Sequence, residues 1–176
     1  MLLDQVKAIR GNKNRDWNKY LKPEDWETIN KRILPSEWYP LELYRRLGLA
    51  TFNVLGQGNV DIVRLRGQTR GKELFETIYK SLITPQDPMT TLSRFVVAYG
   101  QLFNFSFLKC ENAGKNHAKI FHDYSSSDPV TKPYCYQLMG NLEVLVEMAG
   151  GRNVNVELKA KQWEGAPATI FDINWE

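Results

Sequence analysis

The sequence has few of the residues that build metal centres and disulfide frameworks. In 176 residues it contains two cysteines, Cys110 and Cys135, and two histidines, His117 and His122. The cysteines form no CxxC motif and are too few for a secreted disulfide scaffold, so we expect two reduced, buried thiols. The histidines are five residues apart in a segment with strand periodicity, which places them on opposite faces. We therefore expect no metal site and no bound cofactor.

Motifs for catalysis and nucleotide binding are also missing. The sequence has no GxSxG, HExxH, P-loop or GxGxxG arrangement. Gly56-Gln57-Gly58 follows a helical pattern instead of a strand, so we interpret it as a helix end and turn, with a phosphate cradle as the alternative. Glu143 and Glu147 lie one helical turn apart, and we expect a solvated pair on an amphipathic helix. The sequence thus predicts a protein that is not an enzyme.

Long apolar runs and a strong charge imbalance are absent as well. No stretch has the length and hydropathy of a membrane span, and the first residues do not resemble a signal peptide, so we expect a cytoplasmic protein. The net charge is only +3. Basic residues gather between Lys7 and Lys22 and between Arg64 and Lys72, and we interpret both groups as solvated faces, with a surface for nucleic acid or an acidic partner as the alternative. We expect no nucleic-acid partner.

The residues that are present favour one globular domain over 1–176. The sequence is 43% hydrophobic and 24% charged, which is sufficient for a packed core at this length. Prolines at helix starts and apolar residues at steps of three and four predict five helices in the first part of the chain. Their ranges are 23–32, 40–55, 59–66, 72–82 and 88–103. Gly67 and Gly71 between two of them permit a bend or a close helix crossing.

The periodicity changes from helical to alternating after Gly100. Phe103, Phe105 and Phe107 alternate, and residues 118–124 alternate again after a turn at 112–116, which predicts a β-hairpin. A helix is expected over 133–149 and a second hairpin over 154–175, in which one face of the last strand carries Thr169, Phe171, Ile173 and Trp175. The pattern predicts an α+β fold with a helical N-terminal half followed by hairpin, long helix and hairpin.

Two segments resemble a family that has many paralogues in myxobacteria. The first runs from Trp26 to Leu47 and includes the helix start Trp38-Tyr39-Pro40. The second runs from Gly140 to Trp175 and includes a helix that ends at Gly150-Gly151 and an alternating strand pair. The wider superfamily comprises 4-vinyl reductase-type sensor domains, haem-NO-binding-like domains and TRAPP-type trafficking subunits. The resemblance covers nearly the whole chain and implies helices packed on a twisted antiparallel sheet, with a small apolar ligand between the layers in some members.

The sequence departs from this superfamily at two ligand motifs. Relatives of the 4-vinyl reductase type often carry zinc-binding cysteines in the last hairpin, whereas residues 159–169 contain no thiol. The haem-binding relatives hold the haem propionates with a Tyr-x-Ser-x-Arg motif. The matching stretch here, Tyr124-Ser125-Ser126-Ser127-Asp128, has an acid in the position of the arginine. The resemblance therefore implies neither zinc nor haem.

Aromatic and polar side chains on the predicted elements provide one candidate ligand site. It is bounded by the helix over 88–103, the helix over 133–149 and the strand over 118–124. Helical spacing puts two of its members one turn apart, and strand alternation places a third beside Ile120. The candidate residues are Tyr99, Phe103, His122, Tyr134 and Met139. Under the alternative interpretation, these side chains contact each other as ordinary core.

Two functions of different classes are consistent with these features. The first is a non-catalytic regulatory or sensor-type domain that binds a small apolar ligand and signals to a protein partner, as the resemblance implies. The second is a ligand-free protein-interaction module that forms a homodimer through exposed helices, as TRAPP-type subunits do.

Overall fold

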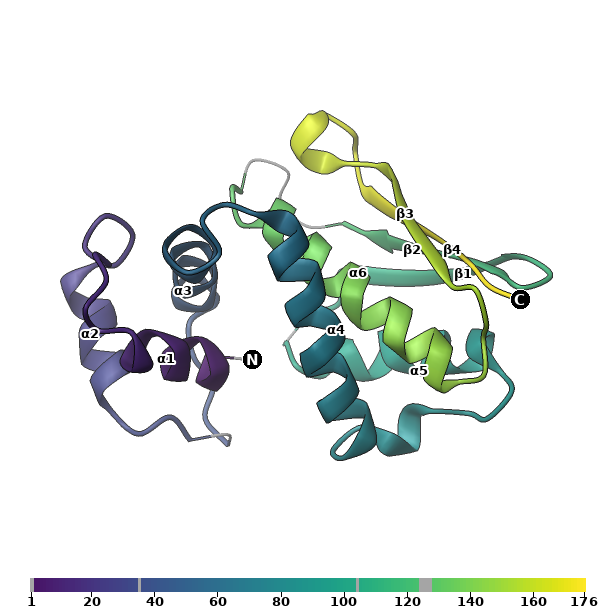
Figure 1. Ribbon diagram of the computed structural model, residues 1–176, viewed down its shortest axis with the longest axis horizontal. Coiled ribbons are helices and arrows are strands. Elements are labelled where there is room, and N and C mark those ends of the chain that lie inside the picture. Colours follow the sequence, from purple (N-terminus) through teal and green to yellow (C-terminus); the bar gives the residue numbers. More distant parts are fainter. Residues whose placement is uncertain (1, 35, 104, 124–127) are drawn as a thin grey trace. The chain divides into compact units, whose positions relative to one another are not determined.

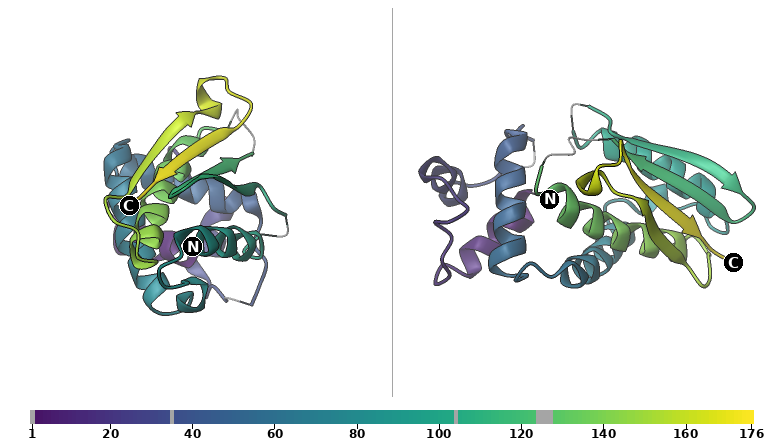
Figure 2. Two further views of the ribbon diagram at one scale, coloured as in Figure 1. Left: turned by 90° about the vertical axis from the view of Figure 1, so that its right-hand side faces the viewer. Right: turned by 90° about the horizontal axis from the view of Figure 1, so that it is seen from above.

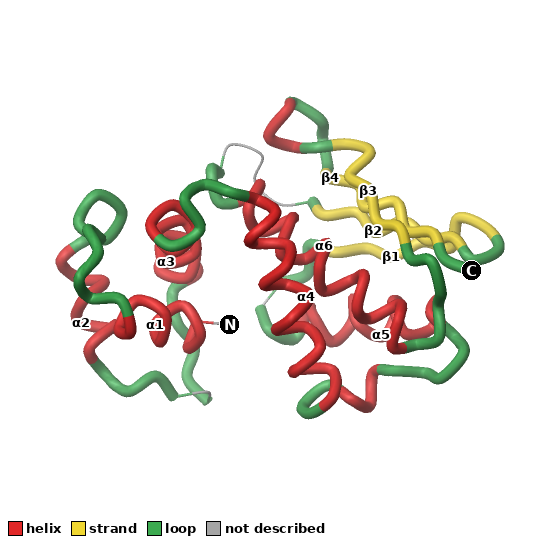
Figure 3. Tube along the Cα trace, viewed as in Figure 1, coloured by secondary structure: helices red, strands yellow, loops and turns green. Residues whose placement is uncertain are grey.

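The chain forms an α+β fold in which helices precede strands. The computed structural model describes residues 2–34, 36–103, 105–123 and 128–176, and in them there are six α-helices and one four-stranded antiparallel sheet. Every strand follows helix α5 in the sequence, and Figure 3 shows the strands in yellow beside the red helices. Within the same residues, no helix combines the length and the hydropathy required to cross a membrane. Backbone contacts divide the chain into two compact units, Met1–Val63 and Arg64–Glu176, and the expectation of one domain over 1–176 stays a prediction.

The first unit contains α1 (Leu2–Gly11), α2 (Pro23–Asn30) and α3 (Leu41–Val54). These helices surround their own hydrophobic core, formed by Val6, Ile9, Trp17, Leu21, Ile29, Leu43, Leu47 and Ala50. The helices predicted over 23–32 and 40–55 are confirmed with slightly shorter bounds. Helix α1 was not predicted, although the spacing of Leu2, Val6 and Ile9 follows the helical period and indicates it.

A buried ion pair joins α2 to α3. The Asp25 side chain is only 1% exposed, and it accepts hydrogen bonds from Arg46 Nε at 3.0 Å and Arg46 Nη2 at 2.6 Å. Burial acts to raise the pKa of Asp25, but the hydrogen bonds from Arg46 and the Lys22 backbone outweigh it and hold the pKa below its usual value. The carboxylate is therefore charged and fixes the two helices to each other.

The sheet of the second unit joins two hairpins through their inner strands. The strands are β1 (Leu108–Gly114), β2 (His117–His122), β3 (Asn155–Ala160) and β4 (Thr169–Asn174), in the order β1-β2-β4-β3. β2 pairs with β4 so that Ile120 lies opposite Phe171. This arrangement confirms the predicted succession of hairpin, long helix and hairpin, and Figure 2 shows that the sheet is twisted.

The first hairpin begins later than the sequence suggests. The alternation of Phe103, Phe105 and Phe107 predicted a strand, but β1 starts at Leu108 and α5 (Pro88–Gly100) already ends at Gly100. Phe103, Phe105 and Phe107 thus lie on an irregular connection, because their side chains gather on one another instead of alternating across a sheet. Tyr124, expected at the end of the second strand, lies outside the described residues.

One face of the sheet is covered by α5 and by α6 (Thr131–Met148), as Figure 1 shows. Helix α5 starts at Pro88, and Asp87 caps it by accepting a hydrogen bond from the Thr90 backbone at 2.9 Å. The covered face of β4 is fully buried at Thr169, Phe171 and Ile173. Trp175 lies just beyond β4 and is half-buried, so it contributes less to the core than its place in the alternation suggests.

Helix α4 (Val60–Glu76) crosses α6 at glycines on both helices. A Cβ atom added to Gly67 would lie 2.2 Å from the Gln137 carbonyl oxygen, and one added to Gly140 would lie 2.1 Å from the Arg64 carbonyl oxygen. The two backbones therefore touch. The separate helices predicted over 59–66 and 72–82 are in fact one continuous helix followed by a 3₁₀ turn, η1 (Lys80–Leu82), and the glycines serve a close crossing instead of a bend.

The crossing also holds a buried carboxylate. Glu143 on α6 is 4% exposed, and its side chain accepts hydrogen bonds from Gln68 Nε2 at 2.7 Å and from the Arg64 guanidinium. The expectation of a solvated Glu143 and Glu147 pair is wrong for Glu143, because α4 covers that face of α6. Glu147 is exposed as expected.

Candidate ligand site

Four of the five predicted site residues meet in one aromatic cluster. We define this aromatic cluster as Tyr99, Phe103, Phe105, Phe107, His122 and Tyr134. The ring centroids of Tyr99 and Phe103 are 5.7 Å apart, and those of His122 and Tyr134 are 5.2 Å apart. Phe107 connects the two pairs, because its ring lies 5.1 Å from Phe103 and 5.2 Å from His122. These separations are typical of favourable aromatic contacts.

Phe107 is the central member that sequence reasoning missed. It stood in the same alternation as Phe103 and Phe105, so no sequence signal distinguished it from them. Met139, the fifth predicted residue, is 7% exposed on α6 and belongs to the same hydrophobic core. The ring contacts that define the aromatic cluster do not involve Met139.

Two pairs of uncharged polar groups involve members of the aromatic cluster. The Tyr134 hydroxyl donates a hydrogen bond to the Tyr99 hydroxyl at 2.6 Å, which links α6 to α5. His122 Nδ1 lies 3.3 Å from Gln162 Oε1, and Gln162 Nε2 donates to the Pro167 carbonyl at 3.1 Å. Because Pro167 fixes the Gln162 amide with its oxygen toward the imidazole, His122 donates through Nδ1 and carries its lone pair on Nε2.

The imidazole of His122 is neutral at physiological pH. Its residue is 1% exposed, and burial lowers its pKa to about 4, although the hydrogen bond to Gln162 acts in the opposite direction. Gln162 lies in η2 (Gln162–Glu164), the 3₁₀ turn between β3 and β4. Sequence reasoning missed Gln162, because its partner on β2 is forty residues away.

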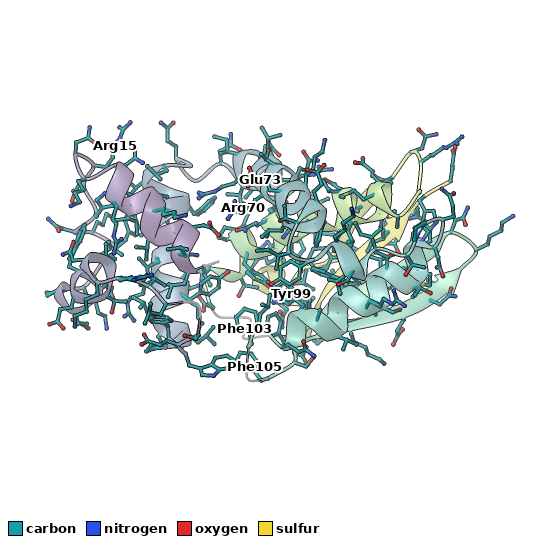
Figure 4. The ribbon with its side chains drawn as sticks, turned by 90° about the horizontal axis from the view of Figure 1, so that it is seen from below. Arg15, Arg70, Glu73, Tyr99, Phe103 and Phe105 are labelled. Carbon is teal, nitrogen blue, oxygen red and sulfur yellow. The ribbon has the colours of Figure 1, made fainter. Side chains whose placement is uncertain are left out.

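The aromatic cluster extends from the core to the surface. His122 is 1% exposed and Tyr99 7%, whereas Phe105 is 36% exposed. Figure 4 labels Tyr99, Phe103 and Phe105, which follow one another in that view. Phe105 also borders a surface hollow between α5 and β1, whose lining includes Val97 and Leu108. The most exposed ring of the aromatic cluster is therefore next to a concave surface.

The two histidines have separate environments, as their spacing predicts. His122 faces the helices, whereas His117 lies on the other face of the sheet, where its Nε2 is 2.8 Å from Asp172 Oδ1. Asp172 also accepts a hydrogen bond from Asn174 Nδ2 at 3.3 Å. In the described parts of the chain, no three potential metal-ligating side chains of His, Cys, Asp or Glu come together.

Comparison with known proteins yields similarity of fold without similarity of sequence. No protein-family model and no curated protein matches the chain. Among solved structures, a mutant H-NOX of T. tengcongensis matches with a TM-score of 0.62 and 16% identity, over 99% of this chain and 95% of that one. An H-NOX protein from S. oneidensis in the Fe(II)NO ligation state matches with a TM-score of 0.61 and 11% identity, over 90% of this chain and 85% of that one. An H-NOX mutant from K. algicida has a TM-score of 0.57 and 12% identity, over 99% and 94%.

The likeness confirms the haem-NO-binding-like part of the resemblance at the level of fold. At sequence identities of 11 to 16%, the likeness to these structures shows the fold alone. The resemblances to the myxobacterial family, to 4-vinyl reductase-type domains and to TRAPP-type subunits stay predictions.

The histidines of this chain do not fit the role of an axial haem ligand. Such a ligand needs an imidazole nitrogen that faces a space wide enough for a porphyrin. The His122 residue is 1% exposed, and its ring packs against Phe107 and Tyr134, so no space for a porphyrin adjoins it. His117 is paired with Asp172 on the opposite face of the sheet. The acid at position 128, where the haem-binding relatives have arginine, agrees with this result.

Proposed function

We propose that this chain is a non-catalytic regulatory domain of sensor type, which binds a small apolar molecule at the aromatic cluster and signals to a protein partner. The observation that carries the proposal is the placement of the Tyr99 and Tyr134 hydroxyls and the neutral His122 imidazole among phenylalanine rings. A mainly apolar site with a few positioned polar atoms is the usual form of a small-molecule site. The fold shared with H-NOX proteins, which are described in ligation states with small gases, supports the same class of function.

Access for the ligand is proposed at Phe105, the most exposed ring of the aromatic cluster. Displacement of Phe105 would bring the ligand to Phe103 and then to the hydroxyl pair. There, the two hydroxyls and the neutral His122 imidazole are the polar groups that would orient a ligand with one polar atom. Haem is not the proposed ligand, because the histidines do not fit it.

The test is a ligand screen with variants that change one polar atom. Native mass spectrometry and thermal-shift measurements would screen small aromatic and lipid-like compounds against the whole chain. For a compound that binds, Tyr134→Phe and His122→Gln should each weaken the affinity by roughly 1 to 3 kcal/mol, the cost of losing a buried hydrogen-bond partner. Tyr136→Phe is the matched control, since Tyr136 is on the same helix but contacts Trp163. If Tyr134→Phe and His122→Gln both leave the affinity unchanged, the site is wrong.

A ligand-free interaction module is the second candidate, and one observation favours it. The rings of the aromatic cluster already contact each other, as in ordinary core. Under this proposal no compound in the screen binds, and association depends on exposed apolar side chains of helices, such as Leu65 and Val97, which are 62% and 68% exposed. Light scattering of Leu65→Ser and Val97→Ser variants would then show weaker association than the wild type.

A further inference from the structure

Strand β1 presents a row of backbone groups that the described sheet does not pair. β1 is at the end of the strand order and pairs with β2 alone among the described strands. The Asp123 backbone N–H donates to the Phe107 carbonyl at 2.9 Å, in register with the β1–β2 pairing. Because hydrogen-bonded positions alternate along an antiparallel strand, Leu108, Cys110 and Asn112 direct their backbone groups away from β2. Such an edge is a template for another strand.

The charged side chains of β1 are complementary to those of a second, antiparallel β1. Lys109 and Glu111 project from the face of the sheet opposite the helices, 73% and 44% exposed, with Lys109 Nζ 2.7 Å from Glu111 Oε1. In an antiparallel pairing of β1 with a second β1 about Cys110, Lys109 lies opposite Glu111 of the partner subunit. By the same symmetry, Glu111 lies opposite Lys109 of the partner subunit. Cys110 then lies opposite its own copy as a hydrogen-bonded pair, and the charged residues occupy the closer, non-hydrogen-bonded positions.

The other edge of the sheet explains why β1 is the better candidate. β3 also carries an acid and a base two residues apart, Glu157 and Lys159, which form an ion pair. The β3–β4 register shifts between Leu158 and Ala160, so an irregularity falls beside Leu158, the centre of the symmetric pairing that would place Glu157 opposite Lys159. An irregularity of this kind protects an edge from further pairing. The shift in β1 lies between Asn112 and Gly114, at its end.

Apolar side chains next to β1 provide a surface for the second copy to cover. The hollow between α5 and β1 is lined by Val97, Phe105, Leu108 and Cys110, among others. Val97 is 68% exposed and Phe105 36% exposed. A strand added at the β1 edge brings the second copy's α5 over the same face, so apolar surface is buried together with the backbone hydrogen bonds.

We propose that the protein forms a two-fold symmetric homodimer by antiparallel pairing of β1 with β1 of a second copy, centred on Cys110. The two four-stranded sheets then form one continuous sheet. The interface is isologous, as expected for a closed dimer. The proposal does not depend on a ligand at the aromatic cluster.

Charge exchange within β1 tests the proposal. Sedimentation velocity over a concentration series should show a reversible dimer for the wild type. Lys109→Glu or Glu111→Lys places like charges opposite each other and should raise the dissociation constant by roughly tenfold or more. The double variant Lys109→Glu/Glu111→Lys recreates both opposite pairs and should restore the dimer. Lys159→Glu, the matched change on β3, should leave it unchanged.

Crosslinking at Cys110 gives a second and independent measurement. A short thiol-specific crosslinker should join two chains through Cys110, since opposed residues in an antiparallel pair have Cα atoms about 5.5 Å apart. Cys135→Ser should preserve the crosslink, because Cys135 is fully buried, and Cys110→Ser should abolish it. A wild-type protein that remains monomeric at high micromolar concentration overturns the proposal. The proposal is also overturned if the single charge changes leave the dissociation constant unchanged, or if the double variant does not restore dimerisation.

Discussion

The hydroxyl of Tyr134 donates a hydrogen bond to the hydroxyl of Tyr99 at 2.6 Å, which joins the two helices that cover the sheet. Tyr99 is on α5 and Tyr134 is near the start of α6, and thirty-five residues separate them in the sequence. Both rings also contact Phe107. The pair thus combines a directional bond with aromatic packing and positions α5 relative to α6.

We predict that Tyr134→Phe lowers the free energy of unfolding by about 1 kcal/mol. The ring contacts with Phe107 and His122 remain, whereas the hydrogen bond to Tyr99 is lost in a mostly buried environment. Urea denaturation at pH 7 measures the change, with Tyr136→Phe as a control on the same helix. Equal effects of the two substitutions would show that the bond to Tyr99 contributes nothing particular to stability.

Stability should also decrease between pH 6.5 and pH 4 because of His122. Burial lowers the pKa of His122 in the folded protein to about 4, from about 6.5 for an unfolded histidine. The unfolded state therefore binds a proton first as the pH falls. The contribution of the neutral imidazole is complete above pH 6.5 and is lost as the pH falls through this window, by up to roughly 3 kcal/mol.

The variant His122→Gln isolates this contribution. A glutamine amide can still donate to Gln162, but it does not titrate, so the variant should lose less stability than the wild type between pH 6.5 and pH 4. Thermal melts at several pH values measure the two slopes. Parallel slopes for the variant and the wild type would contradict a buried, neutral His122.

The fold was largely predictable from the sequence because its periodicities are local. The alternation of Val156 and Leu158 and of Phe171 and Ile173 predicted β3 and β4, and Asp87-Pro88 predicted the start of α5. The predictions that failed did so where contacts between distant segments decide the local structure. The sequence predicted separate helices on either side of Gly67 and Gly71, whereas both glycines are interior residues of α4, where they permit the close crossing named as one alternative. The packing of Phe103 on its neighbours overrides the strand pattern.

The candidate site was predictable only in part. Helical spacing correctly grouped Tyr99 with Phe103, and strand alternation placed His122 on the covered face. Gln162 and Phe107 were missed because their roles depend on how η2 and the connection before β1 fold back on the sheet. That information is carried by contacts between distant segments and not by any local pattern.

We predict that Gly140→Ala destabilises the fold by about 3 kcal/mol or more. The new methyl group would lie 2.1 Å from the Arg64 carbonyl oxygen, so α4 and α6 would have to separate. Gly100→Ala on α5 is the control, since its methyl group would meet only Ser106, at 3.6 Å, and should change stability by less than about 1 kcal/mol. Thermal denaturation of both variants measures the difference. A Gly140→Ala variant as stable as Gly100→Ala would show that the helices do not cross in contact.

The last prediction concerns haem, the group that the fold most readily suggests. We expect that haem added to the purified protein does not bind stoichiometrically, because the buried His122 ring is packed against Phe107 and Tyr134 and His117 Nε2 is paired with Asp172. Absorbance titration of the Soret region measures binding, and His122→Gln and His117→Ala serve as controls. Weak, unsaturated absorbance that is identical in the wild type and both variants is the expected result, since haem adsorbs to apolar surfaces without an axial ligand. A sharp Soret band at one haem per chain that disappears in either variant would show that a histidine leaves its present partner to bind iron, which requires the rings around it to separate.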